Sequence, residues 1–160
     1  MTESIETKLN QLGIVLPESS GPAANYVNYV VTGQLLFISG KGPTGKPKGK
    51  LGLDYRTEEG YQLARLAGLE VLAAAKHALG SLDRIAQVVK VQGFVNADPN
   101  FDEHHLVLNG FSDLMQEVFG EKGAHARSVL GASSLRDNLP LVVDTIFEIA
   151  FQREEMGDLA

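Results

Sequence analysis

The chain has 160 residues, of which 44% are hydrophobic and 21% are charged, so it is long enough for one packed domain and too short for two ordinary ones. Lysine and arginine number 14 against 20 aspartate and glutamate residues, and the net charge of −6 gives a nucleic acid no overall attraction to the surface. The absence of cysteine excludes a disulfide framework, a thiolate zinc site, an all-thiolate iron–sulfur cluster and a cysteine nucleophile.

The sequence predicts neither export nor a membrane span. Its first ten residues mix charged and polar side chains and lack the apolar core of a secretory signal. The longest apolar-looking stretch, 63–79, contains charged side chains such as Arg65 and Glu70, which a bilayer would have to bury. We therefore expect a single domain over 1–160, located in the cytoplasm and without a membrane partner.

Hydrophobic periodicity predicts the element order β-β-α-β-α-β-β after a short N-terminal helix. In 57–79, Leu63, Ala67 and Val71 share one helical face, and in 85–97 apolar and polar residues alternate as in a half-buried strand. In chain order, the predicted elements are helix 3–12, a β-hairpin over 25–41 with its turn at 32–34, a Gly- and Pro-rich loop over 42–57, helix 57–79, strand 85–97, helix 101–119, strand 125–135 and strand 141–152.

The ends of the chain are expected to lie outside the packed core. Residues 1–20 form an N-terminal extension, and we expect its helix to pack on the outside of the domain, beside the mouth of a cleft or against the long loop. Residues 154–160 are expected to be a frayed tail.

This element order favours an α+β fold in which two helices cover one face of a mixed β-sheet. The last strand is apolar on both sides, with Val142 and Ile146 on one and Val143 and Phe147 on the other. An apolar face left bare would be unusual, so we expect an oligomer to cover the side without helices.

Gly40 to Lys46 match the first seven positions of a phosphate-binding loop. Pro47 stands where such a loop needs a serine or threonine, and no helix follows to direct its N-terminus at a phosphate. We therefore interpret the segment as a flexible loop. Four lysines in and just after this segment form the one local basic patch of the chain: Lys41, Lys46, Lys48 and Lys50. They are the only sequence argument for a polyanionic partner.

The four histidines do not predict a metal site. His104 and His105 are adjacent on a predicted helix, so their side chains diverge by about 100° and are poorly placed to share an ion. We expect them to belong to a solvated helix start, and we expect His77, near a helix C-terminus, to interact with the helix dipole.

His125 and Arg127 stand two residues apart on a predicted strand and therefore point to the same face. An arginine there could hold a carboxylate or a phosphate with two parallel hydrogen bonds. It could equally pair with an aspartate or glutamate at the surface of an edge strand. The residues alone leave both interpretations open.

Two stretches resemble a known family: FDEHHLVLNGFSDLMQEVFGEKGAHARSVLGASSL, residues 101–135, and NYVNYVVTGQLLFISGKGP, residues 25–43. Both are similar to the YjgF/RidA group, the reactive-intermediate (enamine/imine) deaminases, which are also labelled endoribonuclease L-PSP or translation initiation inhibitor. The resemblance covers about residues 20–150 and is greatest to the longer YjgF-like subgroup.

The resemblance implies a fold like chorismate mutase of the Bacillus type, in a homotrimer with clefts between subunits and without a cofactor. It implies that Arg127 holds the carboxylate of a 2-imino or 2-oxo acid and that Tyr26 closes the pocket. It also implies a substrate-binding role for Ser39 and Asn109. Beside Arg127, we expect backbone groups near Ser128 and Val129 to contact the substrate nitrogen or the attacking water.

Two positions depart from the deaminase pattern. Val129 stands where the deaminases often have cysteine, and the glutamate of their last strand aligns with Val142, or with Ile146 if Leu139-Pro140 is taken as the matching Leu-Pro pair. Asp144 is the next acidic residue on that face and the remaining candidate acid or base. The resemblance therefore supports carboxylate binding more than deamination.

Three functions are compatible with these observations. The first is a hydrolase for imines or enamines of 2-oxo acids, and the second is a non-catalytic binder of small carboxylates. The third is a ribonuclease or a role in translation, for which His125 and Lys41 are the only acid/base pair that the sequence offers. The acidic net charge argues against this third function.

Overall fold

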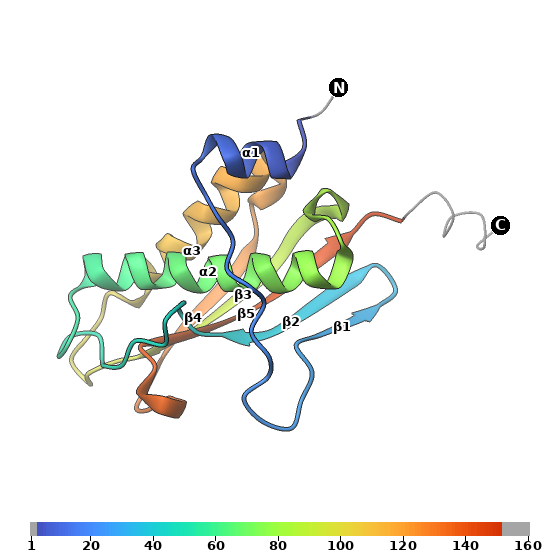
Figure 1. Cartoon of the computed structure of the whole chain (residues 1–160). Helices are drawn as coiled ribbons and strands as arrows, with labels where there is room; N and C mark the ends of the chain where they lie inside the picture. The colour runs from blue at the N-terminus through green and yellow to red at the C-terminus, as the bar shows by residue number, and fades with distance from the viewer. Residues whose placement is uncertain (1–2, 152–160) are drawn as a thin grey trace.

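The computed structural model describes residues 3–151 and consists of one five-stranded sheet with the helices on one of its faces (Figure 1). The strands lie in the order β1-β2-β5-β3-β4, and every neighbouring pair is antiparallel except β3 and β4. The elements are α1 (Ile5–Gln11), β1 (Tyr29–Thr32), β2 (Leu35–Lys41), α2 (Thr57–Leu79), η1 (Leu82–Arg84), β3 (Ile85–Asn96), α3 (His104–Phe119), η2 (Gly120–Gly123), β4 (Ala126–Ala132), η3 (Arg136–Asn138) and β5 (Leu141–Ile149).

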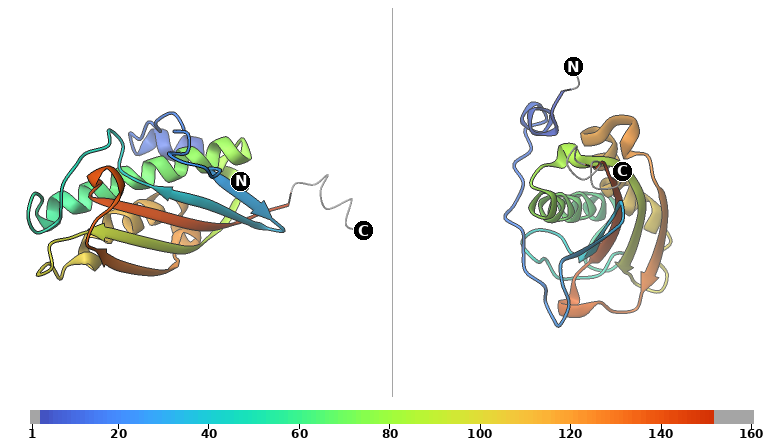
Figure 2. Two further views of the ribbon diagram at one scale, coloured as in Figure 1. Left: turned by 90° about the horizontal axis from the view of Figure 1, so that it is seen from below. Right: turned by 90° about the vertical axis from the view of Figure 1, so that its right-hand side faces the viewer.

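The predicted α+β fold, its element order and its two covering helices are confirmed. Seen from below in Figure 2, the strands lie in front of the helices, and no helix of the described residues covers that face of the sheet. Helix α3 begins at His104, later than predicted, because Asp98–Phe101 form a hydrogen-bonded turn after β3. Strand β5 ends at Ile149, and the predicted tail at 154–160 lies outside the described residues.

Strand β5 lies in the middle of the sheet and shows the two-residue period of a strand with one fully buried face. On the helix side, Val143 and Phe147 are completely buried beneath α2 and α3, whereas Val142 and Ile146 on the other side are only partly buried. We call this second side, which no described helix covers, the open face of the sheet.

Helices α2 and α3 approach closely because glycines stand at their contact. A Cβ atom added at Gly110 would lie 1.9 Å from the backbone oxygen of Tyr61, and one added at Gly68 would lie 2.6 Å from the side chain of Leu114. This close approach seals the core between the helices and the sheet, where Phe111 is completely buried. It also fixes how α3 lies over β4.

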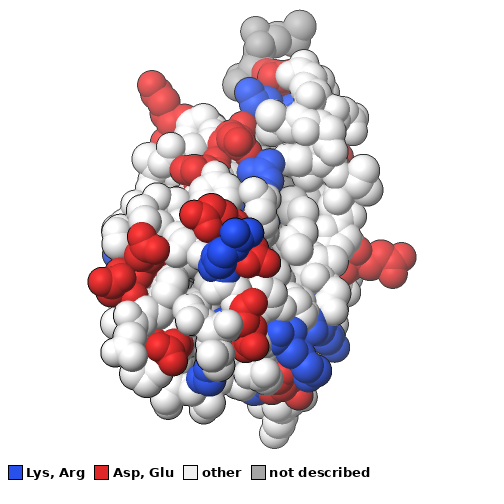
Figure 3. Space-filling view, turned by 90° about the vertical axis from the view of Figure 1, so that its left-hand side faces the viewer, with Lys and Arg blue, Asp and Glu red and all other residues white. Residues whose placement is uncertain are grey.

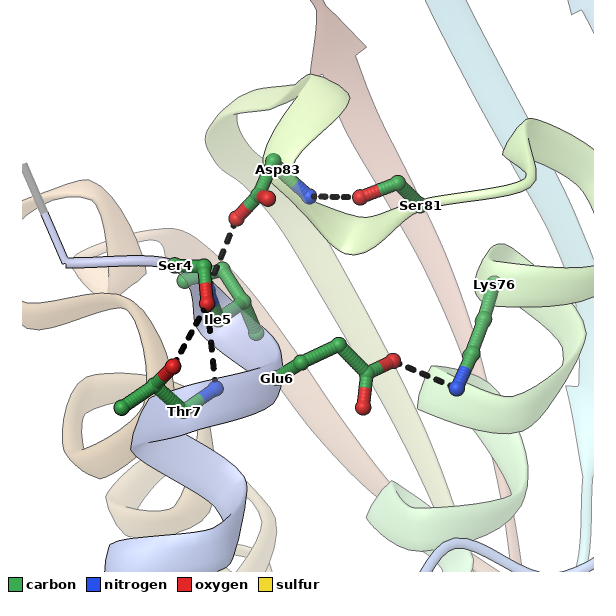
Figure 4. Close-up of polar contacts among 7 residues, drawn as sticks. All are labelled: Ser4, Ile5, Glu6, Thr7, Lys76, Ser81 and Asp83. Carbon is green, nitrogen blue, oxygen red and sulfur yellow. Dashed lines mark hydrogen bonds and ion pairs between the residues drawn. The ribbon is translucent and has the colours of Figure 1, made fainter.

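Helix α1 packs on the outside of the domain, as predicted, but near the C-terminal end of α2 and not against the 42–57 loop (Figure 4). Ser4 caps the helix by accepting a hydrogen bond from the Thr7 N–H at 3.1 Å, and the Ile5 N–H donates to Asp83 Oδ1 of η1 at 2.7 Å. Glu6 forms an ion pair with Lys76 of α2.

The 42–57 loop is irregular, as predicted. Of the four lysines predicted to form a basic patch, Lys46 is exposed, whereas the other three donate hydrogen bonds to the protein itself. Lys41 is only 6% exposed and donates to Asn28 Oδ1 at 2.8 Å, while Lys50 donates to Asn96 Oδ1 at the same distance. Lys48 donates to the backbone oxygen of Asp137. Buried polar groups need hydrogen-bond partners, and here the lysines supply them to the protein itself. On the face drawn in Figure 3, acidic side chains are scattered, and several basic side chains gather at the lower right.

Within residues 3–151, no helix has the length and apolar character needed to cross a membrane.

We predict that Gly110→Ala lowers the free energy of unfolding by about 2 kcal/mol or more, because the added methyl group forces α2 and α3 apart. The gain in helix propensity, about 1 kcal/mol, does not offset this clash. Urea unfolding measures the change. Gly21→Ala is the matched control, since no atom lies within 4 Å of a Cβ placed there; equal stabilities of the two variants would contradict the packing described.

Candidate functional site

Arg127 lies on β4, at an edge of the sheet, and its side chain points toward α3. In the parallel ladder it stands beside Val91, which is completely buried on the helix side. Its Nη1 donates to Ser112 Oγ and its Nη2 to the backbone oxygen of His105, each at 3.0 Å. No carboxylate of the described residues forms an ion pair with Arg127. The structure therefore does not show the surface ion pair that the sequence left open.

His125 stands beside Arg127 and shares its hydroxyl partner. Its Nδ1 lies 2.6 Å from the backbone oxygen of Gly123, and its Nε2 lies 2.8 Å from Ser112 Oγ. A carbonyl oxygen can only accept, so Nδ1 carries the proton, and Nε2 of the neutral ring accepts from the Ser112 hydroxyl. Burial, and to a smaller extent the nearby Arg127 cation, lowers the pKa of His125, although the hydrogen bond to Gly123 acts in the opposite direction.

Ser128 and Asp144 lie on the open face, on the side of the sheet opposite to Arg127. Asp144 of β5 stands beside Gln92 of β3, which in turn stands beside Ser128 of β4. Lys90 belongs to the same face, with its Nζ 3.5 Å from Ser128 Oγ. Burial raises the pKa of the Asp144 carboxyl, and the charge of Lys90 opposes this change. Within one chain, Asp144 and Arg127 do not face a common ligand.

Tyr26 lies at the other edge of the sheet, and Ser39 lies on β2, the strand next to that edge. The hydroxyl of Tyr26, just before β1, accepts a hydrogen bond from the Ala23 N–H at 3.0 Å, and Ser39 of β2 donates to the backbone oxygen of Val27 at 2.6 Å. Strands β1 and β4 are the two edges, four strand spacings or about 19 Å apart. Tyr26 and Arg127 of one chain therefore cannot hold the same small ligand.

The remaining predicted residues lie near Arg127 without contacting it. Val129 points to the same side of β4 and is half-buried against the core. Asn109 lies one helical turn after His105 on α3 and lines a surface hollow of about 410 Å³ together with Tyr61 of α2. These two residues border the site, whereas Ser112 and His105 form it.

The pair that the sequence offered for ribonuclease chemistry is not assembled in one chain. Lys41 belongs to β2 and lies beside Val143, whereas His125 precedes the opposite edge strand β4. Burial lowers the pKa of Lys41, and its ammonium group is bound to Asn28 and Ser20. Among residues 3–151 there is also no group of three His, Asp or Glu side chains that could hold a metal ion.

Ser112 is the residue of this site that sequence reasoning missed. It interrupts an otherwise apolar helix face and is only 7% exposed between the buried Phe111 and Met115. A buried hydroxyl needs a hydrogen-bond partner, so a serine within the apolar face of this helix is the one sequence feature that indicates a polar contact here. The partners themselves, His125 and Arg127, could not be assigned before the packing of α3 on β4 was known.

We predict that His125→Gln makes the free energy of unfolding less dependent on pH between 7 and 5. The pKa of His125 in the folded protein lies below the ordinary value of 6.5, so the unfolded chain binds more protons as the pH falls through 6.5. The wild type therefore loses stability over this range, and the variant lacks this contribution. Urea unfolding at pH 7, 6 and 5 measures the slopes.

The control is His77→Gln, which makes the same substitution at an exposed histidine on α2. An unchanged slope in His125→Gln would contradict the environment described for this residue.

A family model described as YjgF/chorismate mutase-like, putative endoribonuclease, matches residues 6–148. Protein TCP17 of Trypanosoma cruzi is 41% identical over 150 residues, which cover 91% of this chain and 94% of that protein.

Solved structures show the same fold. The protein Atu1372 of Agrobacterium tumefaciens, described as of unknown function, is 41% identical with a TM-score of 0.84, covering 91% of this chain and 92% of its own. A protein of Shewanella oneidensis described as a putative endoribonuclease is 36% identical with a TM-score of 0.89, covering 92% of this chain and 100% of its own. With a match over nearly its whole length and the five-stranded sheet described above, the chain belongs to the YjgF/chorismate mutase-like, putative endoribonuclease family.

Proposed function

We propose that this protein binds the carboxylate of a small 2-imino or 2-oxo acid through Arg127, in a cleft between two copies of the chain, and hydrolyses the imine or enamine to a 2-oxo acid and ammonia. The observation that carries the proposal is that Arg127 is half-buried and that its guanidinium has no carboxylate partner in the described residues. Taking a cation out of water is costly without an anion nearby. A ligand carboxylate would supply that anion.

The guanidinium has free donors for such a ligand. An arginine carries five N–H groups, and two of those on Arg127 are used by Ser112 and His105. Each terminal nitrogen therefore keeps one N–H, and the Nε–H remains as well. A carboxylate approaching in the guanidinium plane can accept two of them in parallel, which is the arrangement that arginine holds most strongly.

Two features support a site shared between copies of the chain, which we propose to form a homotrimer. The open face carries large apolar side chains that are well exposed in the single chain, among them Val30 and Leu130, each 51% exposed, and Phe37, 37% exposed. Tyr26 and Arg127 lie at opposite edges of the sheet, too far apart to act together in one chain. Association of copies through these faces and edges would bury the apolar side chains and bring the partner subunit's Tyr26 toward Arg127.

The proposed chemistry needs little from the protein. A protonated imine of a 2-oxo acid is already electrophilic: water adds to its carbon, and ammonia leaves as the carbonyl forms. The protein must hold the carboxylate, orient the water and stabilise the charge that develops. We assign the first task to Arg127 and a hydrogen bond at the pocket mouth to the Tyr26 hydroxyl.

Asp144 is the proposed acid/base partner. Burial raises the pKa of its carboxyl toward neutral pH, and a group that transfers protons works best when its pKa lies near the working pH. Because Asp144 lies on the opposite face of the sheet from Arg127 of its own chain, it would have to act on a ligand held by a neighbouring copy.

Non-catalytic carboxylate binding is the second candidate function. It is favoured by Val142 and Val129, which stand where similar deaminases carry glutamate and cysteine. Neither valine can move a proton, whereas the features that hold a carboxylate do not depend on them.

We predict that the wild type accelerates the release of ammonia and pyruvate from 2-iminopropanoate generated freshly from alanine by an amino-acid oxidase. Arg127→Ala should lower this rate at least about tenfold, because charge-assisted hydrogen bonds contribute about 1.5 to 3 kcal/mol. Arg56→Ala is the matched control, since this side chain is 82% exposed and, among residues 3–151, forms an ion pair with Glu59 alone. Equal rates for the wild type and Arg127→Ala would refute the proposed hydrolase. Stabilisation by 2-oxobutyrate without turnover would instead support the binder.

A further inference from the structure

The hydroxyl of Ser112 joins Arg127 to His125. Ser112 Oγ accepts from Arg127 Nη1 at 3.0 Å, and its proton is directed to His125 Nε2 at 2.8 Å. The far side of the imidazole is held by the backbone oxygen of Gly123 at 2.6 Å. While the His125 ring is neutral, each group in this chain of hydrogen bonds has one role, because the Gly123 carbonyl can only accept and the guanidinium can only donate.

The start of the hydrogen-bond chain is fixed by backbone packing. A Cβ atom added at Gly123 would lie 2.3 Å from the backbone oxygen of Met115 and 2.8 Å from Cα of Gln116. Segment η2 therefore lies directly against α3, and the Gly123 carbonyl is held relative to the helix that carries Ser112. The imidazole spans the gap between the two.

We propose that Ser112 and His125 are positioning residues, which act through Arg127 by holding its guanidinium so that the free N–H groups face the ligand carboxylate. This inference rests on the proposed binding of a carboxylate by Arg127. Neither residue touches the ligand. Their effect is to restrict a long, flexible side chain to one arrangement before the ligand arrives, which lowers the entropy lost on binding.

The rest of the structure fits this role. The second contact of the guanidinium, with the backbone oxygen of His105, comes from the first turn of the same helix α3 that carries Ser112. Two groups on one rigid helix therefore hold both terminal nitrogens of Arg127. Ser112 itself is 7% exposed and is the only hydroxyl bonded to Arg127 in the described residues, so no neighbouring side chain there replaces it.

The hydrogen-bond chain can be tested without a ligand by nitrogen NMR of the histidine rings. We expect His125 to be the neutral tautomer with its proton on Nδ1. The charged group that faces His125 is the Arg127 guanidinium, while Ser112 from α3 and the Gly123 carbonyl from η2 do not titrate in this range. Arg127→Met should therefore raise the pKa of His125. A neutral ring protonated mainly on Nε2 would overturn the proposed chain.

The role in binding is tested by the affinity for 2-oxobutyrate, measured by calorimetry on the full chain. We expect Ser112→Ala and His125→Leu each to weaken binding about fivefold to tenfold, and Ser112→Thr, which keeps the hydroxyl, to restore most of it. Adding Ser112→Ala to Arg127→Ala should cause no further loss, because Ser112 acts only through Arg127. The exposed His77→Leu should bind like the wild type.

The outcomes separate the two proposals. If Arg127→Ala weakens the binding of 2-oxobutyrate, but Ser112→Ala and His125→Leu bind it like the wild type, the positioning role is overturned and the proposed carboxylate site stands. The positioning role is also overturned if Ser112→Ala weakens the affinity for 2-oxobutyrate equally in the wild type and in Arg127→Ala. Such an effect would not act through Arg127. If the wild type does not bind 2-oxobutyrate, both proposals fail together.

Discussion

The structure of this site depends on how the protein accommodates one half-buried cation. Arg127 projects from an edge strand toward a helix and finds a serine hydroxyl and a backbone oxygen there, but no carboxylate among the described residues. Neutral acceptors satisfy two of its N–H groups without neutralising its charge. The hydrogen bonds therefore orient the guanidinium, and the uncompensated charge favours an anionic ligand beside it.

The strand order is the second constraint. With β1 and β4 at opposite edges of the sheet, the residues near Tyr26 and those near Arg127 are held apart by the three strands between them. Asp144 is separated from Arg127 in another way, by pointing to the opposite face. In a single chain, the residues of the proposed site are therefore separated from one another. The exposed apolar side chains of the open face, such as Phe37, provide a surface through which copies of the chain can associate.

Much of the fold could be predicted from the sequence, because its core follows simple periodicities. The apolar residues on both faces of 141–149 predict a strand in the interior of the sheet, and Val143 and Phe147 are indeed completely buried there. The roles of Lys41 and Lys50 could not be predicted, because their hydrogen-bond partners, Asn28 and Asn96, are distant in the sequence. Likewise, the pattern of β4 indicated that His125 and Arg127 share a face, but only tertiary packing brings Ser112 between them.

The most direct test of this account is a crystal structure of the protein with 2-oxobutyrate. We predict that the ligand carboxylate accepts two hydrogen bonds of about 2.7 to 2.9 Å from Arg127, at a boundary between two copies of the chain, with Ser112 still bonded to the guanidinium. A carboxylate bound away from Arg127, or a site formed entirely within one chain, would contradict the account.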